Sequence, residues 1–414
     1  MSPSVEPLPI QKLDTLLAQA LGNNDLRIKH LEWKPLTAPG ENFGSVMLAI
    51  TVTLTRSSNK TETLNLVAKL PPTSAYLLDL FNSPVTFKKE LQFYEMMAKE
   101  FINLQIENGL NEKDLSSLVP KFIGGRIGLK NPREFDEQAV IILENLKFSG
   151  YSTEDRIFGL DRKHTEFAID NLAKLHALII ALRTKKPQLY ERIAAEVSVE
   201  VSNETTEKCV NDMVKKTQSD FESIEEIKPY MDRINRTIER NGQTMKNPEK
   251  LEEPWPTLIH NDFWVNNMMF RHNEKGEPVD MKMVDFQLCL CDYGMKDLIF
   301  FLISSANKEI LDNNLDDMFE LYYSCFIKML KKLNVDTERF SKQKFDEILN
   351  RCGLQKFTQC VMMVQVIQAP KRNSSESKSV EGSDVFMNVS DNEIYRQKLT
   401  HTVTLFDKRG WLLK

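Results

Sequence analysis

The chain has 414 residues, a hydrophobic fraction of 41%, a charged fraction of 27% and a formal net charge of −5. A chain of this length can bury a substantial core, either in one large domain or in two lobes around a cleft, and the composition is that of an ordinary globular protein. The small acidic excess is spread along the chain, which argues against a nucleic-acid-binding face and against a polybasic membrane anchor.

Cysteine usage and the N-terminal stretch both indicate the cytoplasm. The six cysteines are few for this length, and Cys289 and Cys291 are too closely spaced for a zinc knuckle. Reduced thiols in a reducing compartment are therefore expected. The N-terminal stretch lacks the basic start and apolar core of a signal peptide, and runs such as HALIIAL and DLIFFLISSA are too short to span a bilayer. We expect a cytoplasmic protein without membrane association.

The first part of the chain is rich in strand patterns. A short amphipathic helix, PIQKLDTLLAQALG, is expected to stop at Gly22, and RIKHLEWKPL then alternates as a strand does. The next stretch, SVMLAITVTLTRSSNKTETLNLVAKL, predicts a hairpin with its turn at Ser57–Lys60. After Pro71 and Pro72, a helix is predicted over VTFKKELQFYEMMAKEF, and two further strands over VPKFIGGRIG and EQAVIILENL.

Helical patterns dominate after Gly150. RKHTEFAIDNLAKLHALIIALR predicts a strongly apolar helix, and a charged, mostly helical stretch follows from Lys185 to about Asn247. Two short strand patterns, NNMMFRH and DMKMVDFQL, interrupt the helices. Further helices are predicted over DLIFFLISSANKEIL, MFELYYSCFIKMLKKL and FDEILNRCGLQKFTQCVMMVQVIQ, and the polar KRNSSESKSVEGSD is predicted as a loop.

These patterns predict an α+β protein with two lobes, a small β-rich lobe followed by a larger α-helical lobe. We expect a helical N-terminal extension over residues 1–30 and a nucleotide-binding N-lobe over 31–147. The C-lobe would cover 148–414 and carry a helical insert at about 185–250.

The stretch HNDFWVNN carries the strongest chemical signal, in the spacing H-x-D-x-x-x-x-N. Asp262 can accept a proton from a substrate hydroxyl, and Asn267 can offer a carbonyl oxygen to a metal ion. Downstream, Asp285 ends an apolar strand pattern in MVDFQ. A carboxylate and an amide from neighbouring strands suit Mg²⁺, which prefers hard oxygen ligands and shares them with phosphates. These are the parts that phosphoryl transfer needs.

The remaining parts of an ATP site are found upstream. Lys69, inside the strand LNLVAKL, is a candidate for binding the phosphates, and its partner on the next helix would be Glu90, with Glu95 as the second candidate. In APGENFGS, Gly40 and Gly44 allow the backbone to come close to a phosphate.

The segment VIILENL is predicted to connect the two lobes. Backbone groups from Glu144 to Leu146 would pair there with the adenine edge. Further along, Asp297 opens an apolar helix, and we expect it to brace the loop around Asp262.

The order of these motifs resembles the ecdysteroid kinase-like family, relatives of the choline and aminoglycoside phosphotransferases in the protein-kinase-like superfamily. The resemblance covers the Gly loop, VAK, the helix Glu, ILEN, LAKLHA, HNDFWVNN, VDFQ and DLIFFL. It implies Asp262 as the catalytic base, Asn267 and Asp285 as Mg²⁺ ligands, and Lys69 on the ATP phosphates with Glu90 as its partner. The Gly loop has fewer glycines than that of a protein kinase, so the nucleotide would depend on Asn42 and Ser45.

Two spacings favour a small acceptor over a protein. Asp297 follows Asp285 too closely for a long activation segment, and the stretch between LAKLHA and HND is long enough to wall off a pocket. The resemblance implies a small-molecule alcohol, an ecdysteroid or another lipophilic compound, as the acceptor. A choline- or aminoglycoside-type kinase and a catalytically silent nucleotide- or hormone-binding protein stay open as alternatives.

Overall fold

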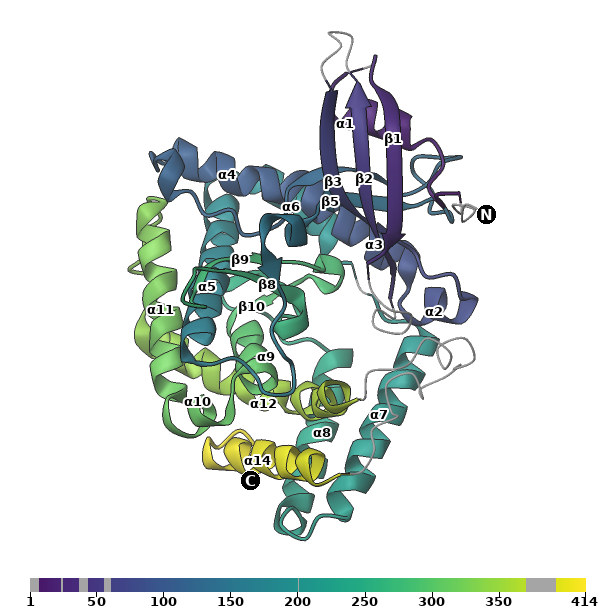
Figure 1. Ribbon diagram of the computed structural model, residues 1–414. Coiled ribbons are helices and arrows are strands. Elements are labelled where there is room, and N and C mark those ends of the chain that lie inside the picture. The colour runs from purple at the N-terminus through teal and green to yellow at the C-terminus, as the bar shows by residue number, and fades with distance from the viewer. Residues whose placement is uncertain (1–6, 24, 37–43, 56–60, 200, 370–391) are drawn as a thin grey trace.

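The computed structural model describes residues 7–23, 25–36, 44–55, 61–199, 201–369 and 392–414. A sheet-rich N-terminal region leads into a larger helical region (Figure 1). The α+β fold class expected from the sequence is confirmed. The expected turn at Ser57–Lys60 and the polar loop over 371–384 lie outside the described residues.

Five antiparallel strands form the N-terminal sheet in the order β1-β2-β3-β5-β4. Along β2, buried side chains alternate with half-buried ones, as the two-residue period of a strand requires. Lys69 lies near the end of the central strand β3, paired with Met47 on one side and Ile141 on the other. The strands are β1 (Arg27–Pro35), β2 (Val46–Thr55), β3 (Thr61–Leu70), β4 (Phe122–Arg126) and β5 (Val140–Glu144).

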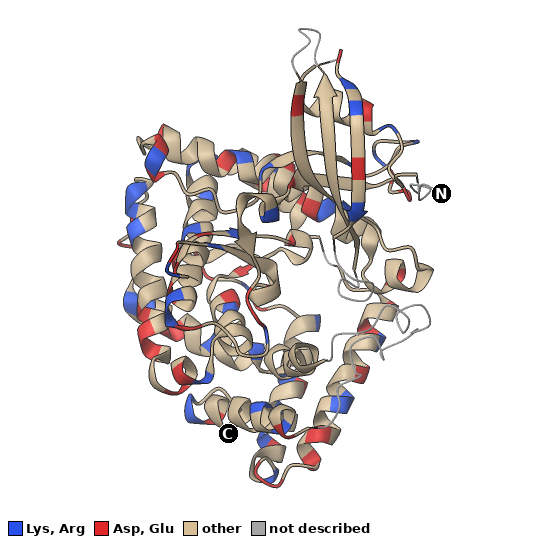
Figure 2. Cartoon of the chain, viewed as in Figure 1, with Lys and Arg blue, Asp and Glu red and all other residues tan. Residues whose placement is uncertain are grey.

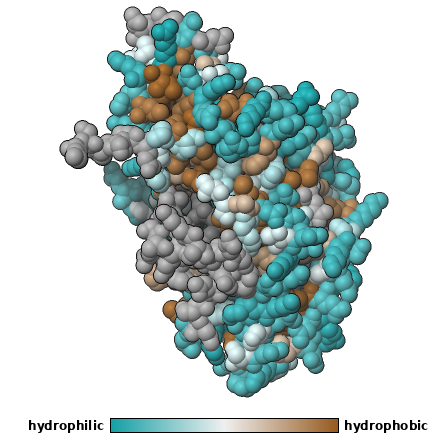
Figure 3. Space-filling view, turned by 90° about the vertical axis from the view of Figure 1, so that its right-hand side faces the viewer, coloured by the Kyte–Doolittle hydropathy of each residue, from teal (hydrophilic) through white to brown (hydrophobic). Residues whose placement is uncertain are grey.

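The two faces of this sheet belong to different hydrophobic cores. One face joins α1 (Leu13–Ala20) through buried side chains such as Leu17 and Ile50. The other face, with Ile141 and Leu143 of β5, joins the large core of the helical region. Figure 3 shows hydrophobic residues gathered over the N-terminal sheet and a mostly hydrophilic surface over the helices below it. The sheet therefore shares one of its cores with the helices.

A long helical segment packs between the sheet and the helical region. Its apolar side chains Phe87, Leu91, Tyr94 and Met97 are buried, as their helical spacing predicts. One π-helical turn interrupts it. The parts are α2 (Ala75–Leu80), α3 (Ser83–Gln92), the π-helix η1 (Phe93–Met97) and α4 (Ala98–Glu107).

The helical region contains the predicted helices with one correction. The stretch DLIFFLISSANKEIL was expected as one helix, but it divides at Ala306, which bridges to Leu160, and Asn307 caps the second part. The expected insert forms α6, α7 and α8. The helices are α5 (Arg162–Lys185), α6 (Pro187–Val197), α7 (Glu204–Glu222), α8 (Met231–Lys246), α9 (Met295–Ser305), α10 (Lys308–Asn313), α11 (Leu315–Lys332), α12 (Lys342–Gln368) and α14 (Glu393–Lys408).

Two small antiparallel sheets lie among these helices and carry the loops of the candidate site (Figure 1). The first has the order β6-β8-β9, and the second pairs β7 with β10. Only β8 and β9 were expected from the sequence. Their bounds are β6 (Tyr151–Ser152), β7 (Pro256–Ile259), β8 (Met268–His272), β9 (Pro278–Met283) and β10 (Leu290–Tyr293).

The surface carries charges of both signs. Lys and Arg alternate with Asp and Glu over the outer helices in Figure 2. Among the described residues, no helix is both long enough and apolar enough to cross a membrane.

Candidate active site

The loop that carries Asp262 follows β7, and the carboxylate of Asp297 accepts hydrogen bonds from its backbone. Asp297, in the first turn of α9, accepts the backbone N–H of His260 at 2.7 Å and that of Asn261 at 2.8 Å. His260 Nε2 donates to the carbonyl of Val284 at 3.0 Å, which links this loop to the segment before Asp285. The prediction that Asp297 braces the loop is confirmed.

Asp297 is itself held by a buried network. His176 of α5 donates from Nε2 to Asp297 at 3.3 Å, and the Tyr322 hydroxyl lies 2.7 Å from His176 Nδ1. Burial opposes ionisation of Asp297, but the hydrogen bond from His176 and the nearby charges hold the pKa of that carboxyl below its usual value. The loop is thereby tied to α5, α9 and α11 through charged and polar groups without contact with solvent.

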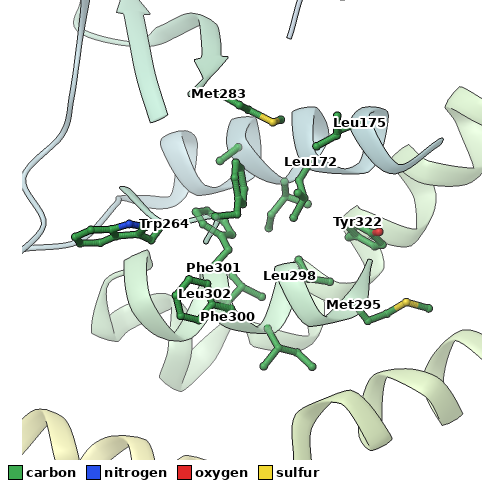
Figure 4. Close-up of a cluster of buried hydrophobic side chains, with 14 of the residues drawn as sticks. Leu172, Leu175, Trp264, Met283, Met295, Leu298, Phe300, Phe301, Leu302 and Tyr322 are labelled. Carbon is green, nitrogen blue, oxygen red and sulfur yellow. The ribbon is translucent and has the colours of Figure 1, made fainter. Parts of the chain in front are cut away.

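An apolar cluster holds the same loop in place. Phe263 packs against Phe301 of α9 with ring centroids 5.3 Å apart. In Figure 4, Leu172 of α5 and Leu298 of α9 converge on this cluster, and Trp264 lies at its edge. Burial of these side chains favours one position of the loop, because moving it would return apolar surface to water.

Asp262 and Asn267 face one another across this loop. Asn267 donates its side-chain amide to the Asp262 carboxylate at 2.9 Å and to the Asp262 carbonyl at 2.9 Å. Burial and the charge of Asp285 raise the pKa of Asp262 to about 7, although hydrogen bonds from Asn267 and Trp264 oppose the shift. A carboxylate with a pKa near neutrality is suited to accept a proton at that pH.

Lys69 joins the N-terminal sheet to the other half of the site. Its ammonium group donates to Glu90 of α3 at 2.5 Å and to Asp285 at 2.8 Å. Glu95, the second candidate partner, is exposed on the π-helical turn. The structure therefore selects Glu90, the residue favoured from the sequence.

The pKa values of Lys69 and Glu90 depend on each other and on the charge of Asp285. Burial alone would lower the pKa of Lys69, but Asp285 and Glu90 raise it above its usual value. Burial raises the pKa of Glu90, and Lys69 opposes that shift. Lys69 therefore stays charged between the two carboxyl groups.

Asp285 is aimed by its backbone. Its φ of 70° lies in the left-handed region, which residues other than Gly seldom adopt. Its N–H donates to the Tyr94 hydroxyl at 3.3 Å, and the next ring, Phe286, stacks on Phe93 with centroids 3.8 Å apart. These contacts with the π-helical turn were not predicted, because nothing in the local sequence indicates which distant ring an aromatic residue will meet.

The predicted nucleotide-contacting residues are described in part. Ser45 is buried immediately before β2, while Gly40 and Asn42 lie outside the described residues. At the end of β5, Glu144 donates its N–H to the carbonyl of Lys121.

The next two residues, Asn145 and Leu146, differ in the hydrogen bonds of their N–H groups. Asn145 donates its N–H to the carbonyl of Asn65, whereas the N–H of Leu146 has no hydrogen-bond acceptor within the described part of the chain. Adenine binding by the Leu146 N–H stays a prediction.

A contact from α12 was missed by the sequence analysis. Lys356 is buried, and its Nζ donates to the Asn261 side chain at 3.0 Å. Gln359 donates to the Asn261 carbonyl at 3.1 Å. Asn261 has a positive φ of 63°, so these bonds hold a strained residue next to Asp262. No local motif marks Lys356, because the contact crosses from a distant helix.

The donor set suits Mg²⁺. With its amide nitrogen on Asp262, Asn267 keeps its amide oxygen for another partner, and Asp285 supplies a partly exposed carboxylate. Oxygen ligands of this kind are those that Mg²⁺ prefers.

Comparison with solved structures finds several small-molecule kinases. The chain is similar to the ethanolamine kinase of Plasmodium vivax, with 10% identity over 92% of this chain and 81% of that one and a TM-score of 0.40. It is similar to a spectinomycin phosphotransferase in complex with ADP and spectinomycin, with 14% identity over 96% and 99% of the chains and a TM-score of 0.45. A choline/ethanolamine kinase family protein of Mesorhizobium loti gives 9% identity, 92% and 91% coverage and a TM-score of 0.40.

No curated protein sequence matches the chain significantly. The protein family described as ecdysteroid kinase-like, in contrast, matches residues 39–335. This range covers the N-terminal sheet from β2 onward, both small sheets, and Lys69, Glu90, Asp262, Asn267 and Asp285. The chain therefore belongs to the ecdysteroid kinase-like family.

Proposed function

We propose that the protein is an ATP- and Mg²⁺-dependent phosphotransferase that phosphorylates a hydroxyl group of a small molecule, an ecdysteroid or another lipophilic alcohol. The observation that carries this proposal is the position of Lys69 between Glu90 and Asp285. A buried lysine on a strand, paired with a helix carboxylate and facing a metal-ligand Asp, is an arrangement that binds nucleotide phosphates. Family membership supports it.

Each residue has a role in an in-line transfer. Asp262 orients the acceptor hydroxyl and takes its proton, while the hydroxyl oxygen bonds to the γ-phosphorus and the bond to the ADP oxygen breaks. Lys69 binds the α- and β-phosphates. Asn267 and Asp285 would hold Mg²⁺, which supplies positive charge to the phosphate oxygens when bound. The N–H of Leu146 would bind the adenine.

The acceptor side is expected between the catalytic loop and the insert. Helices α6, α7 and α8 come between the strand-rich region and the catalytic loop in sequence, and the described residues show no long segment between β10 and α9 on which a peptide could dock. A compact acceptor fits this arrangement better than a protein substrate.

The test is incubation of the protein with ATP, Mg²⁺ and a panel of steroid and amino-alcohol acceptors, with product detection by mass spectrometry. We expect a phosphorylated lipophilic alcohol. Asp262→Asn should lower kcat by about 10²- to 10⁴-fold, because it removes a general base, and should leave ATP affinity nearly unchanged.

Asn266→Ala is the matched control. Asn266 is exposed on the same loop, so its loss should leave turnover unaltered. Absence of both product and nucleotide binding would rule out a kinase, and preferred turnover of amino alcohols would favour a choline-type enzyme. Turnover by Asp262→Asn at the wild-type rate would show that the base is another residue.

A further inference from the structure

Three side chains that the proposed reaction does not use meet at the turn end of the β8–β9 hairpin, which is the end away from Asn267. His272 is the last residue of β8, His164 lies in the first turn of α5, and Glu154 lies in the segment between β6 and α5. His164 Nε2 is 2.9 Å from His272 Nε2, and His272 Nε2 is 3.4 Å from the Glu154 carboxylate. All three ligand atoms lie within 4.8 Å of one another.

Asp161 sets the orientation of the His164 ring. Its carboxylate accepts the Nδ1–H of His164 at 2.8 Å. In the neutral ring, Nε2 then carries the free lone pair, and it points at His272. Histidine metal ligands usually donate a hydrogen bond from the other ring nitrogen to a carboxylate. This hydrogen bond fixes the tautomer and raises the basicity of the nitrogen that binds the metal.

Packing holds this histidine in place as well. The His164 ring meets Phe270 of β8 edge-on, with centroids 5.2 Å apart. The His164 side chain is 11% exposed, that of His272 23% and that of Glu154 32%. An ion can therefore reach the group from solvent while most of each histidine stays packed.

The two separations that involve His272 are close to those in a tetrahedral metal centre. Ligands about 2.0–2.1 Å from Zn²⁺ at tetrahedral angles are roughly 3.3 Å apart. The 3.4 Å separation of His272 and Glu154 fits this value, and the two nitrogens need to separate by only a few tenths of an ångström. Two imidazole nitrogens and one carboxylate favour a borderline transition-metal ion over Mg²⁺, which takes oxygen ligands.

We propose that Glu154, His164 and His272 bind one divalent transition-metal ion of the Zn²⁺ type, with water as the fourth ligand. The ion would fasten the start of α5 and the preceding segment to the outer end of the β8–β9 hairpin. Along β8, His272 is about 16 Å from Asn267 at the rise of a strand. The site is therefore distinct from the Mg²⁺ site expected at Asn267 and Asp285.

The test is a Zn²⁺ titration of the full chain after chelator treatment, with Mg²⁺ in saturating excess so that the nucleotide site does not compete. Isothermal calorimetry should show one equivalent bound by the wild type. His272→Gln and Glu154→Ala should each weaken binding at least tenfold. Asp161→Asn keeps an oxygen for the cap of α5 and should cost about 10- to 100-fold in affinity, as expected for a residue behind a ligand.

His401→Gln is the matched control. His401 also faces a carboxylate, that of Asp312 at 2.6 Å, but no second histidine joins this pair among the described residues. Its loss should leave Zn²⁺ affinity unchanged. Thermal melting without metal checks that each variant folds, and tetrahedral Co²⁺ absorption in the wild type gives a second readout that should vanish in His272→Gln.

Two results would overturn the proposal. One is equal Zn²⁺ affinity of the wild type and of a folded His272→Gln or Glu154→Ala variant. The other is no Zn²⁺ binding by the wild type in the presence of Mg²⁺, which would leave the cluster as a hydrogen-bonded group only. Neither result depends on kinase activity, so the proposed function stands or falls separately.

Discussion

Lys69 of the strand-rich region forms an ion pair with Asp285 of the helical region. Its side chain is 7% exposed, and that of Glu90 is 2% exposed. Two carboxylates within 2.8 Å offset the desolvation of its ammonium group. Removal of one member of such a buried group leaves an uncompensated charge, which is more costly than replacement of the pair by apolar residues.

Lys69→Met should therefore destabilise the protein by about 3–5 kcal/mol, because Glu90 is left buried without its cation. Lys69→Met with Glu90→Leu should recover part of that loss. Urea unfolding of the wild type, the single variant and the double variant measures the difference. If the double variant is no more stable than Lys69→Met, the buried charge is not the cause.

Residues of the candidate site were predictable where the local sequence around them has a recognisable pattern. Asp262, Asn267 and Asp285 follow strand or loop patterns, and Lys69 interrupts an apolar strand, so the sequence alone marks them. The choice between Glu90 and Glu95 depended on helix phase, which the π-helical turn at Phe93–Met97 alters. Lys356 and the Phe286–Phe93 stack had no local signal, because their partners are far away in sequence.

At the scale of elements, the long helix α12 packs closely against the Trp411 ring at Gly353, where there is no room for a Cβ. A Cβ on Gly353 would lie 2.2 Å from the Trp411 ring, which is 1% exposed. A Cβ on Gly242, in the exposed part of α8, would meet no atom within 4 Å. The two helical glycines therefore have opposite consequences when replaced.

Gly353→Ala should destabilise the protein by about 1–3 kcal/mol, because the buried indole must move. Gly242→Ala should stabilise it by up to about 1 kcal/mol, because alanine favours the helix where space is free. Thermal or denaturant unfolding of both variants gives the comparison. Equal effects of the two substitutions would show that the Trp411 contact carries no cost.

Element types were easier to predict than their ends. The period-two pattern of β2 and the helical spacing of α5 and α11 are strong over many residues, and those elements appear as expected. β7 and β10 have four residues each, and β7 is buried throughout, so neither presents an alternating pattern. The break between α9 and α10 depends on the bridge from Ala306 to Leu160, a tertiary contact.

At the scale of the whole molecule, one hydrophobic core runs through both regions. It includes Ile141 and Leu143 of the sheet, Phe93 of the π-helical turn and Phe301 of α9. The boundary expected near residue 147 stays a prediction, since apolar contacts continue across it. The two-region α+β fold was predictable from strand and helix patterns, whereas the acceptor-binding surface was not, because no motif in α6–α8 marks it.

Mg-ATP should stabilise the whole molecule, because Lys69 and Asp285 belong to different regions that a bound nucleotide would join. At a ligand concentration of 100 Kd the gain is about 2.7 kcal/mol, which appears as a higher Tm. Chelation of Mg²⁺ should remove most of it. Asp262→Asn should keep the shift and Asp285→Asn should lose it; an unchanged Tm in the wild type would contradict the proposed nucleotide site.

The hydrogen bond from Lys69 to Asp285 also sets a time order during protein synthesis. The two residues are 216 positions apart. At about 5–20 residues per second, the ribosome adds Asp285 roughly 10–45 s after Lys69. For most of that interval the nascent chain holds Lys69 with Glu90, which is one of the two carboxylates that contact its ammonium group. A chain released before Asp285 would therefore lack the second carboxylate that accepts a hydrogen bond from the Lys69 ammonium group, which makes it a ready target for degradation.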